Sequence, residues 1–290
     1  MMRKGMWYML RMGLPCVLVL ILVPVVAPLA FGAMHISRTQ PALVGPKAYY
    51  LALGDSLAFG YQPNFNWVSG YANVFFSDLQ KHGVQHYDNL ACPGESIVSL
   101  IHGGCQYALL RKYLYNGPQL QEAVNYLHAH AGQVSPVTLD IGANDLIPDL
   151  NTANCSIKAN WQNDLSMVNN NLKNVVLPQL IAAMTVNGRM SGDLILLNYY
   201  DPYQDICPNT LANIQAFNQD LAADVSGRAT LVDVFSAFAT SSTGTVSSSA
   251  SASASHLCLY TWMCNKTKNI HPNQAGYRLM ASAIENTVKY

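Results

Sequence analysis

Short apolar runs alternate with longer amphipathic segments along most of this chain, and this alternation restricts its fold more than any other feature. Each run that favours a β-strand is followed by a stretch whose apolar residues recur at helical spacing. The pattern is typical of a parallel sheet, because parallel strands need long crossover connections that are usually helices. The strand-like runs are 48–53, 86–90, 137–141, 194–198 and 230–234. The main helical segments are 71–81, 119–130, 157–185, 209–225 and 272–288.

This order predicts a single doubly wound α/β domain over residues 47–290, with a flavodoxin-like, five-stranded parallel sheet and helices on both faces. A hydrophobic content of 50% is enough for a sizeable core, so folding does not require a metal. The chain has 16 basic and 16 acidic residues. That balance argues against a nucleic-acid-binding protein that depends on a strong positive charge.

One segment departs from the alternation. Residues 240–255 consist almost entirely of Ser, Ala, Thr and Gly, which cannot bury a core. We therefore expect a flexible surface loop. It is either a tolerated insertion or a flap beside an active site, since it ends 16 residues before His271, one of the candidate site residues below.

The N-terminus has the pattern of a secretory signal peptide. Basic residues precede an uncharged, mostly apolar run over 14–31, and small residues follow it. Cleavage after Gly32 makes residues 1–32 the signal peptide and residues 33–46 an N-terminal linker. The alternative is an uncleaved membrane anchor, since the 18 uncharged residues could just span a bilayer. Three prolines within the run weaken a spanning helix.

Six cysteines remain once the predicted signal peptide, which contains Cys16, is removed. An even number in an exported chain predicts three disulfides. We expect nearest neighbours to pair, because this arrangement closes the smallest loops. A zinc site is the competing interpretation, but the sequence lacks a Cys-x-x-Cys pair, so no metal is predicted. The expected bridges are Cys92–Cys105, Cys155–Cys207 and Cys258–Cys264.

Candidate functional residues follow the ends of the predicted strands. Ser56 comes after the first strand in Gly-Asp-Ser, Gly94 lies after the second, and Asn144 follows the third in Gly-Ala-Asn-Asp. His271 precedes the last helix in Ile-His-Pro-Asn. Because the carboxyl ends of parallel strands meet at one edge, where open α/β sheets bind ligands, we expect these residues to lie together.

This ordered set of motifs resembles the GDSL family of lipases and esterases in its SGNH hydrolase form, which is named for Ser, Gly, Asn and His in separate blocks. Those four letters match Ser56, Gly94, Asn144 and His271. The segment His-Pro-Asn-Gln-Ala-Gly-Tyr-Arg that begins at His271 also looks like the family's closing block. The resemblance covers the chain from about residue 48 to the C-terminus.

The resemblance implies acyl transfer on a serine. Ser56 would be the nucleophile and His271 the general base, because a serine hydroxyl attacks only when a neighbouring imidazole takes its proton. The oxyanion of the intermediate would be bound by the backbone N–H groups of Ser56 and Gly94 and by the Asn144 amide. No metal and no organic cofactor are implied.

One position departs from the family pattern. The family usually places an Asp three residues before the histidine to orient its ring, and here that residue is Lys268. A lysine would disfavour the imidazolium that catalysis must stabilise. Either a backbone carbonyl near residues 268–269 holds the ring N–H, or another acid reaches it. Asp233, just past the fifth strand, is the acid expected closest to the site.

The sequence thus predicts a secreted or cell-surface serine esterase or lipase acting on small-molecule esters, either acyl lipids or acetylated carbohydrates. Its aromatic cluster after the fourth strand, which includes Tyr199 and Tyr200, could line an acyl or sugar pocket. The alternative from another class is a non-catalytic cell-surface protein that keeps the fold and binds lipids or glycans. Hydrolysis of nitrophenyl esters separates the two.

Overall fold

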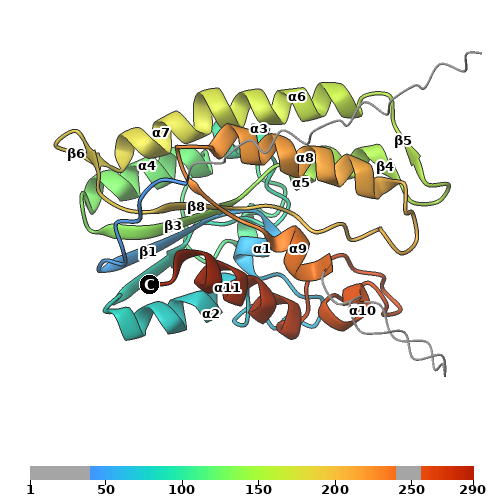
Figure 1. Ribbon diagram of the computed structural model, residues 1–290, viewed down its shortest axis with the longest axis horizontal. Coiled ribbons are helices and arrows are strands. Elements are labelled where there is room, and N and C mark those ends of the chain that lie inside the picture. The colour runs from blue at the N-terminus through green and yellow to red at the C-terminus, as the bar shows by residue number, and fades with distance from the viewer. Residues whose placement is uncertain (1–39, 240–255) are drawn as a thin grey trace, which may run out of the picture. The chain divides into compact units, whose positions relative to one another are not determined.

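The centre of the fold is a parallel sheet whose strand order is β2-β1-β3-β8-β9, which confirms the predicted five-stranded α/β architecture. A computed structural model describes residues 40–239 and 256–290 of the chain (Figure 1). All neighbouring strands in this sheet are parallel, so their carboxyl ends lie at one edge. The strands are β1 (Tyr49–Gly54), β2 (His86–Asn89), β3 (Val134–Asp140), β8 (Leu194–Leu197) and β9 (Thr230–Val232).

The central strands are apolar because helices cover them on both faces. Every residue of β3 and of β8 is buried, whereas the edge strand β2 begins at an exposed His86. A strand that is covered on both sides reads as a nearly continuous hydrophobic run instead of an alternating one. This is why the segment Leu-Ile-Leu-Leu of β8 could be recognised as a strand from its sequence.

Two layers of helices enclose the sheet, as Figure 1 shows. One layer contains α4 (Gln119–Ala129), α6 (Trp161–Asn171), α7 (Leu177–Ala183) and α8 (Thr210–Val225). The other contains α2 (Tyr71–Leu79) and α11 (Gln274–Val288), which pack against each other. A π-helical turn at Leu172–Val176 joins α6 to α7, so the predicted segment 157–185 is largely one helical path.

Shorter elements extend from the strand ends. The short helices are α1 (Ser56–Phe59), α3 (Ile97–His102), α5 (Ala143–Leu146), α9 (Val234–Ala239) and α10 (His256–Tyr260). Two small antiparallel hairpins are formed by β4 (Leu150–Asn151) with β5 (Ser156–Ile157) and by β6 (Thr185–Val186) with β7 (Arg189–Met190). Three-residue 3₁₀ turns occur at Gln80–His82, Ala108–Leu110 and Ile147–Asp149.

Several sequence predictions fall outside the described residues. They are the signal peptide or anchor at 1–32, the first half of the linker at 33–46, and the loop at 240–255. The end of the linker is attached to the domain, because the backbone N–H groups of Val44 and Gly45 donate to the Asp193 carboxylate at 2.6 and 2.8 Å. Across 40–239 and 256–290, the helices are too short or too polar to cross a bilayer.

Three disulfides crosslink the domain, and their pairing confirms the nearest-neighbour prediction. The bridges Cys92–Cys105 and Cys258–Cys264 close short loops, of 13 and 6 residues in sequence separation. Cys155–Cys207 joins positions 52 residues apart.

Candidate active site

The four sequence blocks meet at the carboxyl edge of the sheet. Ser56, Gly94, Asn144 and His271 all line one cavity of about 430 Å³. Three of them follow β1, β2 and β3, which are adjacent in the sheet, and His271 lies just before α11. The parallel topology therefore brings together residues that are up to 215 positions apart.

Ser56 lies on a tight strand-to-helix turn that depends on Gly54. At φ 130° this residue has a conformation that other residues rarely adopt, and a Cβ there would come within 2.2 Å of the Asp140 carbonyl oxygen. Asp55 then caps α1, because its carboxylate accepts from the backbone N–H of Leu57 at 2.8 Å. The turn places Ser56 at the first position of the helix, with only 9% of its surface exposed.

Ser56 and His271 form a direct hydrogen bond. Their Oγ and Nε2 atoms are 2.7 Å apart. On the other side of the ring, Nδ1 lies 2.8 Å from Oδ1 of Asn269. The same oxygen accepts from the backbone N–H of His271 at 3.0 Å. Because a backbone N–H can only donate, the amide oxygen must face the ring, so Nδ1 carries the proton and Nε2 is free to accept.

The ring environment is neutral. Burial disfavours the charged imidazolium and lowers the pKa of His271 to about 4. Tyr61 packs against the ring with centroids 4.7 Å apart. Trp67 stacks on Tyr61 at 6.2 Å, and Phe65 lies 5.7 Å from Trp67. A row of aromatic rings therefore leads from His271 to Phe65, which is exposed.

Asp233 does not occupy the place that was considered for it. Its carboxylate accepts from Asn198 at 2.9 Å and from Ser236 at 2.6 Å, and it lines a different depression from the one that contains His271. The reason lies in the strand order. Asp233 follows the edge strand β9, and two strands separate β9 from β1, a distance of about 14 Å at the usual strand spacing. The geometry instead places a side chain that the sequence analysis missed, Asn269, beside the imidazole.

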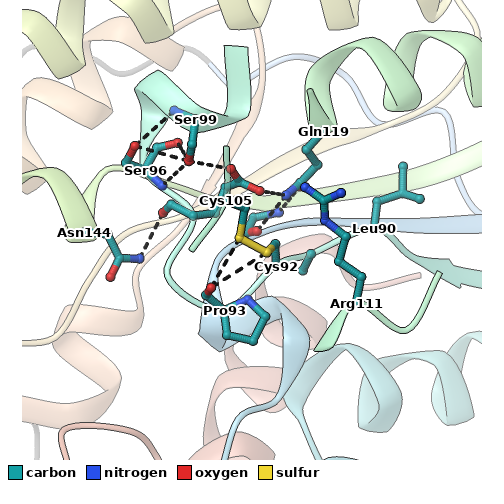
Figure 2. Close-up of a disulfide and its surroundings, with 12 residues drawn as sticks. Leu90, Cys92, Pro93, Ser96, Ser99, Cys105, Arg111, Gln119 and Asn144 are labelled. Atoms are coloured by element: carbon teal, nitrogen blue, oxygen red, sulfur yellow. Dashed lines mark hydrogen bonds between the residues drawn. A yellow bond between two sulfur atoms is a disulfide. The ribbon is translucent and has the colours of Figure 1, made fainter. Parts of the chain in front are cut away.

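We use the name oxyanion loop for residues 90–105, which include Gly94. This glycine has φ 78°, and a Cβ there would lie 3.2 Å from the Tyr107 ring. The disulfide between Cys92 and Cys105 closes the loop (Figure 2). Asn144 approaches from α5, and its amide nitrogen donates to the Glu95 carbonyl oxygen at 2.9 Å. The candidate oxyanion donors are thus neighbours in the structure.

We use the name histidine loop for residues 261–273. Its chain is fixed by backbone bonds, of which one runs from Trp262 N–H to the His271 carbonyl at 2.9 Å. The Tyr200 hydroxyl also donates to the Ile270 carbonyl at 2.5 Å. Tyr200 belongs to the aromatic cluster that the sequence singled out, and both it and Tyr199 line the cavity.

Two buried carboxyl groups hold the serine turn, residues 54–56: Asp55 belongs to the turn and Asp140 is bonded to it. Asp140 accepts from the Tyr71 hydroxyl at 2.6 Å and from the backbone N–H of Asp55 at 3.1 Å. Asp55 accepts from the Tyr199 hydroxyl at 3.0 Å. Burial, followed by the nearby charge of Asp140, raises the pKa of Asp55 well above its usual range. These groups fix the turn, whereas the His271 ring is hydrogen-bonded to Ser56 and Asn269.

Part of the cavity wall is apolar. The side chains on this wall come from α5, the following 3₁₀ turn, β4 and α8. They are Leu146, Ile147, Leu150, Ile214 and Phe217. Such a surface suits a hydrocarbon group better than a strongly hydrated one.

Comparison with known proteins agrees with this geometry. The family model of the GDSL-like lipase/acylhydrolase family matches residues 52–279. The chain belongs to this family. Membership makes this GDSL-like protein a carboxylic ester hydrolase, as the sequence predicts. A comparison with curated protein sequences finds no significant match.

Solved structures show the same GDSL-type fold at low sequence identity. The lipase Lip_vut3 from a goat rumen metagenome is 16% identical with a TM-score of 0.54, over 83% of this chain and 97% of that one. The acetylxylan esterase Axe2 from Geobacillus stearothermophilus is 14% identical with a TM-score of 0.52, over 86% and 97%. At these identities the likeness concerns the fold.

Proposed function

We propose that the protein is an exported serine esterase that forms an acyl-enzyme on Ser56, with His271 as the general base. The observation that carries the proposal is the 2.7 Å contact between Ser56 Oγ and His271 Nε2. This distance is within reach for proton transfer from the hydroxyl to the ring. Asn269 supports the role by holding Nδ1–H, so that Nε2 has its lone pair directed at the serine.

The reaction has two halves. In the first, Ser56 Oγ attacks the ester carbonyl carbon while its proton moves to Nε2. The intermediate collapses with cleavage of the bond to the alcohol oxygen, which leaves with the proton from Nε2. In the second, water attacks the acyl group, its proton passes to Nε2, and the carboxylic acid is released as Ser56 regains a proton.

Both halves pass through a tetrahedral oxyanion that needs hydrogen-bond donors. The backbone N–H groups of Ser56 and Gly94 and the Asn144 amide are the proposed donors, since all three residues line the cavity. The Asn144 nitrogen carries two hydrogens, and its bond to the Glu95 carbonyl leaves the second one for the substrate.

The cavity favours an ester with an apolar acyl group. Its wall near Asn144 is formed by Leu146, Ile147, Ile214 and other apolar side chains. The acetyl group of an acetylated carbohydrate would cover little of this wall, whereas a longer acyl chain buries more apolar surface. Acyl lipids are therefore the preferred substrate class, with acetylated carbohydrates as the second candidate.

A nitrophenyl ester series tests this function. We expect kcat/KM to rise from the acetyl ester to medium-chain esters, and an organophosphonate to label Ser56. Ser56→Ala should abolish both signals. Binding without turnover would support the non-catalytic lipid- or glycan-binding alternative. A rate that falls steadily as the acyl chain lengthens would contradict the apolar pocket.

Export is supported by the three disulfides, which persist in oxidising compartments. We expect the secreted protein to begin after Gly32 and to expose no reactive thiol before reduction. N-terminal sequencing and thiol titration check the two statements separately. A protein that stays in the membrane fraction with its first residues intact would instead indicate an anchor.

A further inference from the structure

We propose that Gln119 and Glu95 form a buried positioning pair that sets the geometry of the oxyanion hole. The inference rests on the proposed function of Ser56, Gly94 and Asn144. Neither Gln119 nor Glu95 lines the cavity, so both would act indirectly. Gln119 would act through the Gly54 backbone, and Glu95 through its bond to Gln119.

Gln119 is bonded to the residue that opens the serine turn. It is the first residue of α4, and only 1% of its surface is exposed. Its Oε1 accepts from the backbone N–H of Gly54 at 2.7 Å, and its Nε2 donates to the carbonyl of the same residue at 3.0 Å. Both polar groups of the Gly54 backbone are thus held by one side chain. The Cys92 N–H also donates to the Gly54 carbonyl, at 3.1 Å.

The second hydrogen of the Gln119 amide connects this turn to the oxyanion loop. Nε2 donates to Glu95 Oε2 at 2.8 Å. Figure 2 shows Gln119 and Asn144 on either side of the Cys92–Cys105 disulfide. Glu95 is fully buried, and its other carboxylate oxygen accepts from the Ser99 hydroxyl at 2.5 Å.

Glu95 completes a connection among all three candidate donors. It directly follows Gly94, and its carbonyl oxygen holds the Asn144 amide at 2.9 Å. Gly54 lies two residues before Ser56 in the serine turn. The Gln119 and Glu95 side chains therefore join the Ser56 turn to the residue that follows Gly94, and the backbone carbonyl of that residue holds the Asn144 amide. Donors preorganised in this way need no rearrangement when the oxyanion forms.

The functional groups of Gln119 and Glu95 match the hydrogen bonds that hold the serine turn and the oxyanion loop together. Gln119 needs an acceptor for Gly54 N–H and two donors for Gly54 O and Glu95, and a terminal amide supplies all three. A buried carboxyl group such as Glu95 is unfavourable unless it is hydrogen-bonded, and apolar side chains of similar volume would fill the space at lower cost. A network that served packing alone would not need these groups.

The test compares apolar and conservative variants of the pair. Gln119→Met and Glu95→Met keep the length of each side chain but remove its hydrogen bonds to Gly54, Ser99 and the other member of the pair. We expect each to lower kcat by roughly 10- to 100-fold while KM changes by less than about threefold, because the oxyanion exists only after attack. Glu95→Gln keeps an acceptor for Gln119 and can donate to Ser99, so it should restore most of the activity. Gln121→Met, on the exposed side of the same helix, is the matched control.

A double-mutant cycle separates positioning from a structural role. In the Asn144→Ala background, Gln119→Met should cost much less than in the parent, because residues that act on one oxyanion are not additive. The acidic limb of the pH–rate profile should stay unmoved, since His271 and Asn269 are untouched. The proposal is overturned if the falls in kcat of Asn144→Ala and Gln119→Met multiply in the double variant. It is also overturned if KM of Gln119→Met rises as much as kcat falls, or if this variant lowers only the melting temperature.

The Ser56→Ala variant distinguishes the two levels of proposal. If Ser56→Ala is inactive while Gln119→Met and Glu95→Met are fully active, the positioning pair is wrong and the serine mechanism stands. If Ser56→Ala retains activity, both proposals fail together. Should Gln119→Met not fold, the contrast between Glu95→Met and Glu95→Gln gives the same decision.

Discussion

The oxyanion loop and the histidine loop are held in place by different kinds of group. The oxyanion loop has a buried carboxyl group, Glu95. It also contains α3, whose first backbone N–H, that of Ile97, donates to the Asp145 carboxylate at 2.8 Å. The partners of the His271 ring are the neutral side chains of Ser56, Asn269 and Tyr61. The difference suits one loop to fixed donors and the other to a base that is uncharged before it accepts a proton.

This contrast follows from what each side must do. Donors for an oxyanion must already point at the right place, so rigid, buried networks suit them. A general base must accept a proton, and a carboxylate at Nδ1 would raise its pKa, whereas the Asn269 amide fixes the tautomer without adding a charge. On the proposed mechanism, the oxyanion loop would position donors, whereas the histidine loop would set the pKa of the base.

The largest expected effect comes from removing the Ser56 hydroxyl, on which both the oxyanion loop and the histidine loop would act. Ser56→Ala should lower kcat on a nitrophenyl ester by about 10³-fold or more, with the melting temperature nearly unchanged, because the nucleophile is lost. Ser77→Ala, an exposed serine on α2, is the control. Near-full activity in a folded Ser56→Ala protein would remove Ser56 from the mechanism.

Removing one oxyanion donor should have the next largest effect. Asn144→Ala removes one of three proposed donors and should reduce kcat by roughly 10²- to 10³-fold, with a smaller change in KM. Asn170→Ala, exposed on α6, provides a matched substitution. A rise in KM without a fall in kcat would instead make Asn144 a residue of the substrate pocket.

The third prediction adds a carboxylate beside the imidazole of His271. In the parent, the acidic limb of kcat/KM should lie near pH 4, because burial lowers the pKa of His271 to about 4. Asn269→Asp adds a carboxylate that stabilises the imidazolium, so the pKa rises and the limb moves to higher pH. We expect turnover at pH 8 to rise by up to about tenfold. Profiles recorded from about pH 3 to pH 9 measure both changes.

Lys268→Asp is the control for that experiment, since it restores the usual family residue at its usual position. We expect it to be nearly silent because Asn269 already occupies the place beside Nδ1. If Lys268→Asp moves the limb and Asn269→Asp does not, the histidine is oriented from residue 268. A collapse of activity in Asp233→Asn would return the role to Asp233.

The smallest expected effect on turnover concerns the disulfides. Replacing Cys92 and Cys105 with Ala should loosen the oxyanion loop and lower kcat by a few fold, roughly threefold to tenfold. Replacing Cys155 and Cys207 should leave kcat unchanged, although it should cost about 4 kcal/mol of stability because the crosslink closes a longer loop. Denaturant unfolding and steady-state kinetics on both double variants test this ordering. Equal kinetic losses would contradict a special role for the oxyanion loop bridge.

Much of the fold and part of the site could be predicted because their signals are local. The apolar runs of β1, β3 and β8 end at Gly54, Asp140 and Leu197, and the motifs that follow them lie close to these ends. Asn269 also had a local signal that was missed. An Asn side chain commonly accepts from the backbone N–H two residues later, as it does here with His271.

The positioning pair could not have been found in this way. Gln119 and Gly54 are 65 residues apart, and Gln119 and Glu95 are 24 apart. At the start of a helix, a glutamine is ordinarily a solvated residue, and only the packing of α4 against the strand ends makes it a buried partner. Asp233 was misplaced for a related reason, since its distance from Ser56 depends on the order of strands in the sheet.

The aromatic row that begins at His271 has a practical consequence. Trp67 is separated from the imidazole by one ring, that of Tyr61, and its indole N–H donates to the Gln62 carbonyl at 3.1 Å. An acyl group on Ser56 displaces the hydrogen bond that holds the imidazole, and Tyr61 can pass this change to the indole. We therefore expect the fluorescence of Trp67 to follow acylation and deacylation in stopped-flow experiments, so that unlabelled natural esters can be compared without a chromophore.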